Sequence, residues 1–266
     1  MSVPRIIHQI MFNFDTNYPP TDKSYINKPI PEKWKKSNSE WKKIHPTWKY
    51  ILWNDLMVYN MIKDYYPFFL ETYLNYKYPI QRVDAAKYFI LHRYGGIYVD
   101  LDLYPNEPID KYFTSTGIDA YFSYGKSCVG NSFMASKKNS IFWTFLFDEL
   151  MKVKLNMFIK FSKHFTVMST TGPIFLNNVI SKYDNGIIGR LPKKFFSHEL
   201  YCGETSVLSS LEGMSWCGWD SYIFNFLYKN LVFNIFLLVL SVILIIFILG
   251  FFVIEFRQKY NICKNS

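Results

Sequence analysis

The stretch formed by residues 81–105 constrains the fold more than any other part of the sequence. Its first half carries apolar side chains at helical spacing, which predicts a helix with one face packed on a sheet. These apolar positions are Val83, Ala86, Ile90 and Tyr94. Gly95 and Gly96 follow and end the helix, because glycine accepts the left-handed conformation of a helix exit. The β-prone run 97–101 then predicts a short, buried parallel strand.

Two aspartates end this predicted strand. Side chains two residues apart in a strand point to the same side, so Asp100 and Asp102 are expected to converge. Hard oxygen donors suit Mg²⁺ or Mn²⁺, and a metal with so few protein ligands takes the others from phosphate and water. Because a D-x-D pattern also occurs by chance, its interpretation depends on the residues upstream.

Asp84 and Lys87 lie one helical turn apart, on the face of the predicted helix opposite its apolar stripe. We expect both side chains to point toward a bound ligand. The alternative is an ordinary ion pair at i,i+3 spacing, which stabilises a helix by roughly a few tenths of a kcal/mol.

The same stretch resembles the D-x-x-R-Y-x-x-L-x-x-Y-G-G-x-Y-x-D-x-D signature of the DXD-containing sugar transferases. This family includes the fungal inositol phosphoceramide mannosyltransferases, and the large clostridial toxin glucosyltransferases are distant relatives. The matching positions are Asp84, Tyr88, Leu91, Tyr94, Gly95, Gly96, Tyr98, Asp100 and Asp102. The family arginine is here Lys87, and lysine cannot hold a carboxylate or phosphate through two parallel hydrogen bonds.

The resemblance implies a GT-A-type α/β domain, a Rossmann-like sheet flanked by helices, that transfers a hexose with retention of configuration. It implies Mn²⁺ or Mg²⁺ as cofactor, with Asp102 as ligand and Asp100 on the donor ribose or the metal. Asp84 would hold sugar hydroxyls, and these three aspartates are the expected catalytic residues. Lys87 would offset the charge of the donor diphosphate, and Tyr98 would also bind the donor. No general base or nucleophile emerges from the sequence. The resemblance does not require one, because in a retaining transfer the leaving phosphate can take the proton.

The beginning of the chain, residues 4–12, predicts a buried strand. It also resembles the family's opening P-x-I-I-H-Q-I-W, in which the strand end meets the nucleotide base. His8 and Gln9 match this motif and are candidates for donor binding. Met11 replaces the family tryptophan, so a stacking platform for the base has to come from Phe12 or is lost.

Other patterns fill in the α/β domain. They predict strands at 48–53, 119–124, 129–136, 187–191 and 194–197, and helices at 32–44 and 141–157. Asn54 and Asp55 signal another helix start, and residues 67–78 a short helical connector. Thr171, Gly172 and Pro173 resemble a family segment whose backbone approaches the acceptor. Asn131 falls where relatives face the donor sugar, although a loop asparagine that caps a turn is the favoured interpretation.

Residues 213–220 form a second informative stretch, which resembles the S-W-H-x-x-D segment that closes the family's catalytic domain. Ser215 and Trp216 are expected to approach the donor diphosphate. Cys217 stands in place of the histidine, and a thiol suits softer ions than Mg²⁺ or Mn²⁺. Asp220, or Glu212 upstream, is therefore the expected oxygen ligand of the metal.

The run 231–254 is apolar except at Asn234, Ser241 and Gly250, and it predicts one transmembrane helix. A catalytic domain is expected over 1–228 and a short basic tail over 255–266. We favour a single-pass protein of an endomembrane, Golgi or endoplasmic reticulum. The lack of a secretory signal before Pro4 favours a cytosolic domain, whereas the basic tail and the family resemblance favour the lumen.

The charge balance narrows the partners. With 30 Lys and Arg against 21 Asp and Glu, the net charge of +9 favours anionic ligands or a membrane surface. No basic run or nucleic-acid motif is present, so nucleic acid is not an expected partner. The four cysteines form no C-x-x-C pair and leave the redox compartment open.

We therefore expect a nucleotide diphosphate sugar as donor, GDP-mannose or a UDP-hexose, and a lipid-linked or glycan acceptor at a membrane. One alternative is a catalytically decayed, membrane-tethered binder of nucleotide sugars or glycans, marked by Lys87, Met11 and Cys217. The other is a metal-dependent phosphohydrolase, which would need further acidic or histidine ligands grouped near the aspartates.

Overall fold

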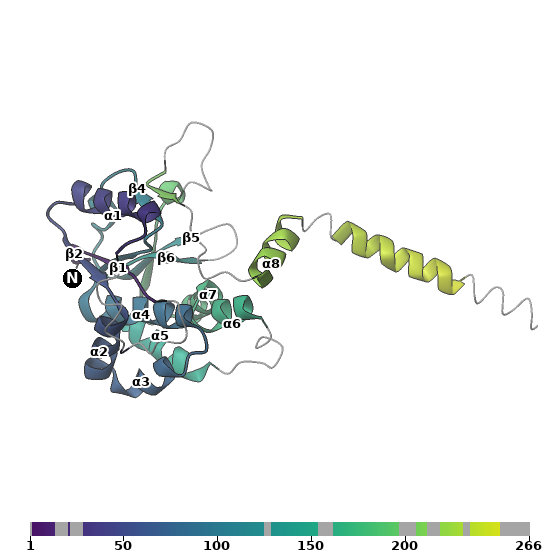
Figure 1. Ribbon diagram of the computed structural model, residues 1–266, viewed down its shortest axis with the longest axis horizontal. Helices are drawn as coiled ribbons and strands as arrows, with labels where there is room; N and C mark the ends of the chain where they lie inside the picture. Colours follow the sequence, from purple (N-terminus) through teal and green to yellow (C-terminus); the bar gives the residue numbers. More distant parts are fainter. Residues whose placement is uncertain are drawn as a thin grey trace, which may run out of the picture. The chain divides into compact units, whose positions relative to one another are not determined.

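The computed structural model describes residues 2–13, 21, 29–124, 129–153, 162–196, 206–211, 219–230 and 235–250 (Figure 1). They divide into two compact units, Met1–Trp216 and Cys217–Ser266, which are described separately. The first unit combines a mixed sheet with helices, so the predicted α/β class is confirmed. The predicted limits of the catalytic domain, 1–228, stay a prediction.

A six-stranded sheet in the order β2-β1-β3-β6-β5-β7 forms the centre of the first unit. Its strands are β1 Ile6–Ile10, β2 Lys49–Trp53, β3 Gly96–Val99, β5 Ile118–Tyr124, β6 Val129–Ser136 and β7 Ile187–Arg190. β1, β2 and β3 are parallel, whereas β6 runs antiparallel to both β3 and β5. The expected parallel strand after the two glycines is therefore present, and it is shorter than predicted. A small antiparallel sheet joins β4 Leu103–Pro105 to β8 Leu208–Ser210.

Helices cover both faces of the large sheet. They are α1 Glu32–Ile44, α2 Asp55–Tyr65, α3 Pro67–Leu74, α4 Pro79–Tyr94, α5 Ile141–Lys152, α6 Lys163–Thr170 and α7 Pro173–Lys182. Figure 1 shows α1 and β4 on one side of the sheet and α2 to α7 on the other. Accordingly the core has two parts: Trp41 of α1 packs with Ile97 and Val99, and Phe89 of α4 packs with Tyr98.

The helix α4 is buried on every side, which corrects the expectation of a single packed face. All its residues from Pro79 to Leu91 are buried. Its polar side chains Asp84 and Lys87 are therefore inside the protein, and they need partners there because burying an unpaired charge is costly. The helix end is as predicted: Gly95 has φ +66° and Gly96 has φ +89°. A Cβ on Gly96 would lie 2.4 Å from the carbonyl oxygen of Ile6, so this glycine also lets β3 approach β1.

Several other segments differ from expectation. Residues 194–197 were expected as a strand, but Lys193–Phe195 form a 3₁₀ helix (η4) and Phe196 makes an isolated bridge to Leu208. The helix expected over 141–157 ends at Lys152, and most of its remainder lies outside the described residues. Helix α6 and the strands β4 and β8 lack a clear periodic pattern and were not predicted.

The second unit contains α8 Trp219–Lys229 and a helix at 235–250. This last helix covers part of the span predicted at 231–254. In the part of the chain that the structure describes, no helix has the length and apolar character needed to cross a membrane. The transmembrane anchor and the tail at 255–266 stay predictions.

Candidate active site

The two aspartates of the D-x-D motif lie in a turn that follows β3. The strand ends at Val99, and the amide of Leu103 donates to the carbonyl oxygen of Asp100 at 3.1 Å. The expectation that strand alternation points Asp100 and Asp102 the same way is therefore wrong, because neither residue belongs to the strand. Two backbone hydrogen bonds hold the turn. The amide of Asp100 donates to the carbonyl oxygen of Ser132 at 2.8 Å, and the amide of Leu211 donates to the carbonyl oxygen of Asp102 at 2.7 Å.

A buried ion cluster joins this turn to α4. The ammonium of Lys87 lies 3.1 Å from Oδ1 of Asp84 and 3.2 Å from Oδ1 of Asp100. The Lys87 side chain is only 3% exposed, whereas that of Asp100 is 31% exposed. This arrangement differs from the exposed i,i+3 pair considered as an alternative, since a lysine shared by two carboxylates inside the protein fixes the positions of all three.

The charges in this cluster influence one another. Burial raises the pKa of Asp84, and the nearby Lys87 ammonium opposes this shift only in part. Burial alone would lower the pKa of Lys87, but Asp100 and Asp84 outweigh it, so the pKa is raised and the lysine stays charged. Burial, together with the negative charge of Asp100, raises the pKa of Asp102 to about 6. A cation near Asp100 and Asp102 would relieve their mutual repulsion.

Uncharged side chains orient the carboxylates. The hydroxyl of Tyr98 donates to Oδ1 of Asp100 at 2.6 Å. The amide of Asn131 donates to Oδ1 of Asp84 at 2.9 Å, and the hydroxyl of Thr171 donates to its Oδ2 at 3.4 Å. Because Tyr98 and Lys87 both approach Oδ1 of Asp100, the described residues leave Oδ2 of that carboxylate without a hydrogen-bond donor.

These residues fit a hard divalent cation. Oδ2 of Asp100 and the carboxylate of Asp102 lie two residues apart on a fixed turn. Both supply oxygen ligands, which Mg²⁺ and Mn²⁺ prefer. Within the described ranges no group of three or more His, Cys, Asp or Glu side chains could hold a metal. A metal bound by Asp100 and Asp102 would take further ligands from donor phosphate and water.

His8 and Gln9 lie in β1 beside the site, and both are fully buried. Nε2 of His8 pairs with the carbonyl oxygen of Gly95 at 2.9 Å, and the indole of Trp53 donates to Nδ1 at 3.0 Å. Gln9 reaches the site itself, since its amide donates to the carbonyl oxygen of Asp100 at 3.4 Å. Both side chains support the backbone around the D-x-D turn, and their contact with a donor stays a prediction.

The other predicted site residues are less informative. Phe12 is buried in the core, so its expected role as a stacking platform has no support in the described geometry. Ser215 and Trp216, like Glu212 and Cys217, lie outside the described residues. Asp220 lies in the first turn of α8, where its Oδ1 accepts from the amide of Ser221 at 2.9 Å. It belongs to the second unit, so its role as a metal ligand stays a prediction.

Sequence reasoning missed several polar residues of this site. Asn131 was interpreted as a turn cap, yet it lies in β6 and orients Asp84. Asn38 of α1 and Tyr50 of β2 were not considered. The amide of Asn38 donates to Oε1 of Gln9 at 3.0 Å, and the hydroxyl of Tyr50 donates to the same atom at 2.6 Å. The sequence did contain a signal for Asn38, because this polar residue lies on the same face of α1 as the two tryptophans and so could have been expected to be buried.

Comparison with known proteins agrees with this site. Residues 31–121, which include the D-x-D turn and the ion cluster, match the family described as glycosyltransferase sugar-binding region containing DXD motif. This match confirms the resemblance seen in the sequence.

Its relatives include named mannosyltransferases of fungi. Mannosyl phosphorylinositol ceramide synthase SUR1 of Saccharomyces cerevisiae is 32% identical over 99% of this chain and 63% of its own length. Inositol phosphoceramide mannosyltransferase 1 of Schizosaccharomyces pombe is 28% identical over 99% of this chain and 77% of its own. Among solved structures, PaToxG glycosyltransferase aligns with a TM-score of 0.47 at 16% identity, over 68% of this chain and 70% of that one. The chain thus spans slightly less than two thirds of the yeast relative.

Proposed function

We propose that this protein is a metal-dependent glycosyltransferase that moves mannose from a nucleotide diphosphate sugar to a lipid of the inositol phosphoceramide class. The observation that carries the proposal is the buried Asp84–Lys87–Asp100 cluster, which fixes the D-x-D turn at the carboxyl end of β3. Ligands of open α/β sheets bind at such strand ends. The substrate class is supported by the names of the fungal relatives.

Each residue of the cluster has a separate task in this proposal. Asp100, through its Oδ2, and Asp102 would hold Mn²⁺ or Mg²⁺, which when bound offsets the charge on the departing nucleoside diphosphate. Tyr98 and Lys87 hold Oδ1 of Asp100, so its other oxygen keeps one direction. The expected contact of Asp84 with hydroxyls of the donor sugar stays a prediction, because both oxygens of this buried carboxylate already have partners inside the protein. Lys87 acts by positioning both aspartates, because its ammonium is buried between them.

The finer points of the reaction rest on the family resemblance. A GT-A-type domain, retention of configuration and GDP-mannose as the favoured donor are part of the proposal, with a UDP-hexose as the other candidate donor. A retaining transfer in which the leaving phosphate takes the acceptor proton needs no separate general base from the protein.

Membrane attachment through residues 231–254 is also proposed, because a lipid acceptor is reached most easily by a tethered domain. We favour an endomembrane and a lumenal domain. Protease treatment of sealed microsomes tests the orientation: digestion of the domain without detergent would contradict a lumenal location. A chain that ends after Tyr228 tests the tether, since it is expected to transfer less sugar to membrane-embedded lipid. Equal transfer with and without the helix would contradict the tether.

A panel of nucleotide sugars incubated with the full chain and Mn²⁺ tests the proposed activity. GDP-mannose is expected to be consumed fastest, with transfer of mannose to added inositol phosphoceramide. Binding of nucleotide sugars without any turnover would favour the non-catalytic binder instead. Lys87 is one of the three residues that depart from the family pattern. It keeps two carboxylate partners, which weighs against a loss of catalytic function at this position.

A further inference from the structure

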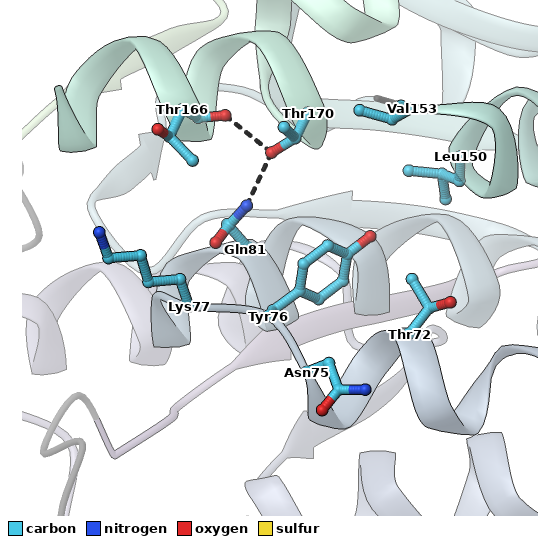
Figure 2. Close-up of a pocket in the computed structure, with 9 residues that line it drawn as sticks. All are labelled: Thr72, Asn75, Tyr76, Lys77, Gln81, Leu150, Val153, Thr166 and Thr170. Atoms are coloured by element: carbon cyan, nitrogen blue, oxygen red, sulfur yellow. Dashed lines mark hydrogen bonds between the residues drawn. The ribbon is translucent and has the colours of Figure 1, made fainter. Parts of the chain in front are cut away.

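A cavity of about 270 Å³ lies at the ends of four helices, and Gln81 in its wall is three residues before Asp84 of the ion cluster. Its walls come from the end of α3, the start of α4, the end of α5 and the body of α6. Figure 2 shows the Tyr76 ring at the centre of the view, with Leu150 on one side and Lys77 on the other. The cavity is slightly smaller than the ~300–1,000 Å³ typical of pockets for drug-sized ligands, so it suits a head group better than a whole lipid.

Residues of the cavity wall are neighbours in sequence of residues in the ion cluster. Gln81 in this wall is one helical turn before Asp84, and its amide donates to the hydroxyl of Thr170 at 2.8 Å (Figure 2). The next residue, Thr171, donates to Asp84 at 3.4 Å. Six residues after Gln81, Lys87 of the same helix lies 3.2 Å from Asp100 of the D-x-D turn.

Three polar groups of the cavity have no partner among the described residues. They are the hydroxyl of Tyr76, the side-chain amide of Asn75 and the ammonium of Lys77, for which the structure shows no hydrogen bond or ion pair. Burial, and to a lesser degree the negative charge of Asp84, raises the pKa of Tyr76, so its hydroxyl remains a donor. The lining is mostly apolar, so the aromatic ring of Tyr76 offers a packing surface and these three polar groups offer hydrogen bonds to a hydroxyl-bearing ring.

The charge at the rim is positive. Lys77 and Lys163 lie on the ring of Tyr78, with their ammonium groups 5.2 and 5.8 Å from its centroid. No Asp or Glu is among the residues that line the cavity. An anionic ligand is therefore favoured.

We infer that this cavity is the acceptor subsite and that it binds a cyclic polyol carrying a phosphate. The polyol ring would pack on Tyr76 and hydrogen-bond to Asn75, while the phosphate would pair with Lys77. This inference rests on the proposed function and adds the position of the acceptor head group. Such a head group occurs on a lipid or as a free phosphorylated cyclitol, and the test separates these sources.

The first experiment is calorimetric titration of the full chain in detergent with inositol 1-phosphate at up to millimolar concentration. Binding is expected, and Lys77→Gln should weaken it about tenfold or more, because a hydrogen bond to a charged group is lost. Tyr76→Phe, which removes only the hydroxyl, should weaken it several-fold. Lys63→Gln is the matched control, since Lys63 is an exposed lysine at the end of α2 and should leave binding unchanged. No binding, or equal binding by Lys77→Gln, would overturn the inference.

The second experiment separates this inference from the proposed function. The same variants are titrated with GDP and Mn²⁺, and their sedimentation with vesicles that contain phosphatidylinositol is measured. Lys77→Gln should keep the affinity for GDP and lose affinity for the vesicles. Loss of GDP affinity instead would place the donor in this cavity and overturn the inference. Binding of inositol 1-phosphate but not of the vesicles would restrict the ligand to the free form. A chain that binds inositol 1-phosphate but turns over no nucleotide sugar would contradict the proposed function alone.

Discussion

The ammonium of Lys87 lies 3.2 Å from Oδ1 of Asp100 and thereby ties helix α4 to the turn that follows β3. The two residues are only 3% and 31% exposed, so the contact is largely shielded from solvent at the lysine and open to ligands at the aspartate. This asymmetry is what a site needs when one carboxylate oxygen is to be fixed and the other is to remain available.

Replacing Lys87 by alanine should destabilise the protein by about 3–5 kcal/mol, because the buried Asp84 would lose its cationic partner. Urea unfolding of the variant measures this loss. Lys87→Arg should retain most of the stability and should preserve or improve donor binding, since arginine can hold a carboxylate through two bonds.

A double variant supplies the control. Lys87→Met combined with Asp84→Asn removes both charges, and it should be more stable than Lys87→Ala alone. If Lys87→Ala unfolds within about 0.5 kcal/mol of the unchanged protein, the cluster is not buried as described.

Gly96 should not tolerate alanine. Its φ of +89° is strained for any other residue, and an added Cβ would meet the Ile6 carbonyl oxygen at 2.4 Å. Gly117 is the matched control: its φ is +82°, but no atom lies within 4 Å of the position of its Cβ. Gly117→Ala should cost about 1–2 kcal/mol from backbone strain, and Gly96→Ala at least about 2 kcal/mol more. Equal thermal unfolding of the two variants would contradict the close packing of β3 on β1.

The stability of the protein should depend on pH through His8. Burial lowers the pKa of His8 from 6.5 to about 4, in spite of its bond to Gly95. The unfolded chain therefore binds more protons than the folded protein between these values. His8 therefore contributes about 3 kcal/mol to the free energy of unfolding above pH 6.5, and this contribution is lost as the pH falls to 4.

Unfolding free energies at pH 7 and pH 4.5 measure this effect, with His8→Gln as the reference. The unchanged protein should lose about 2–3 kcal/mol more than the variant over this interval. An identical loss in both proteins would show that burial does not hold His8 in its neutral form.

The sequence predicted the features that depend on local patterns. Helix α1 was expected at its observed limits, and the helix, the two glycines and the strand of the central motif follow from spacing and from glycine chemistry. The burial of Asp84 and Lys87 could not be predicted in this way, because it depends on Asn131 of β6 and on Thr171 at the end of α6.

The geometry of the two aspartates shows the same limit. Strand spacing suggested that Asp100 and Asp102 point the same way, but the last hydrogen bond to β6 comes from the amide of Asp100 and the chain turns after it. The length of a strand is set by its neighbours in the sheet, which a single sequence does not reveal. The acceptor cavity is also formed by the ends of four helices, so no single stretch of sequence announces it.

The most direct test of the proposed activity is the transfer of labelled mannose from GDP-mannose to inositol phosphoceramide in detergent. The full chain, Asp102→Asn and the exposed control Asp148→Asn are compared with Mn²⁺ and with a chelator. Asp148→Asn should match the unchanged chain. Asp102→Asn and the chelator should each lower the rate by roughly a hundredfold or more, because the charge on the leaving diphosphate is no longer offset. A transfer rate that is the same in all these samples would contradict a metal-dependent glycosyltransferase built on the D-x-D turn.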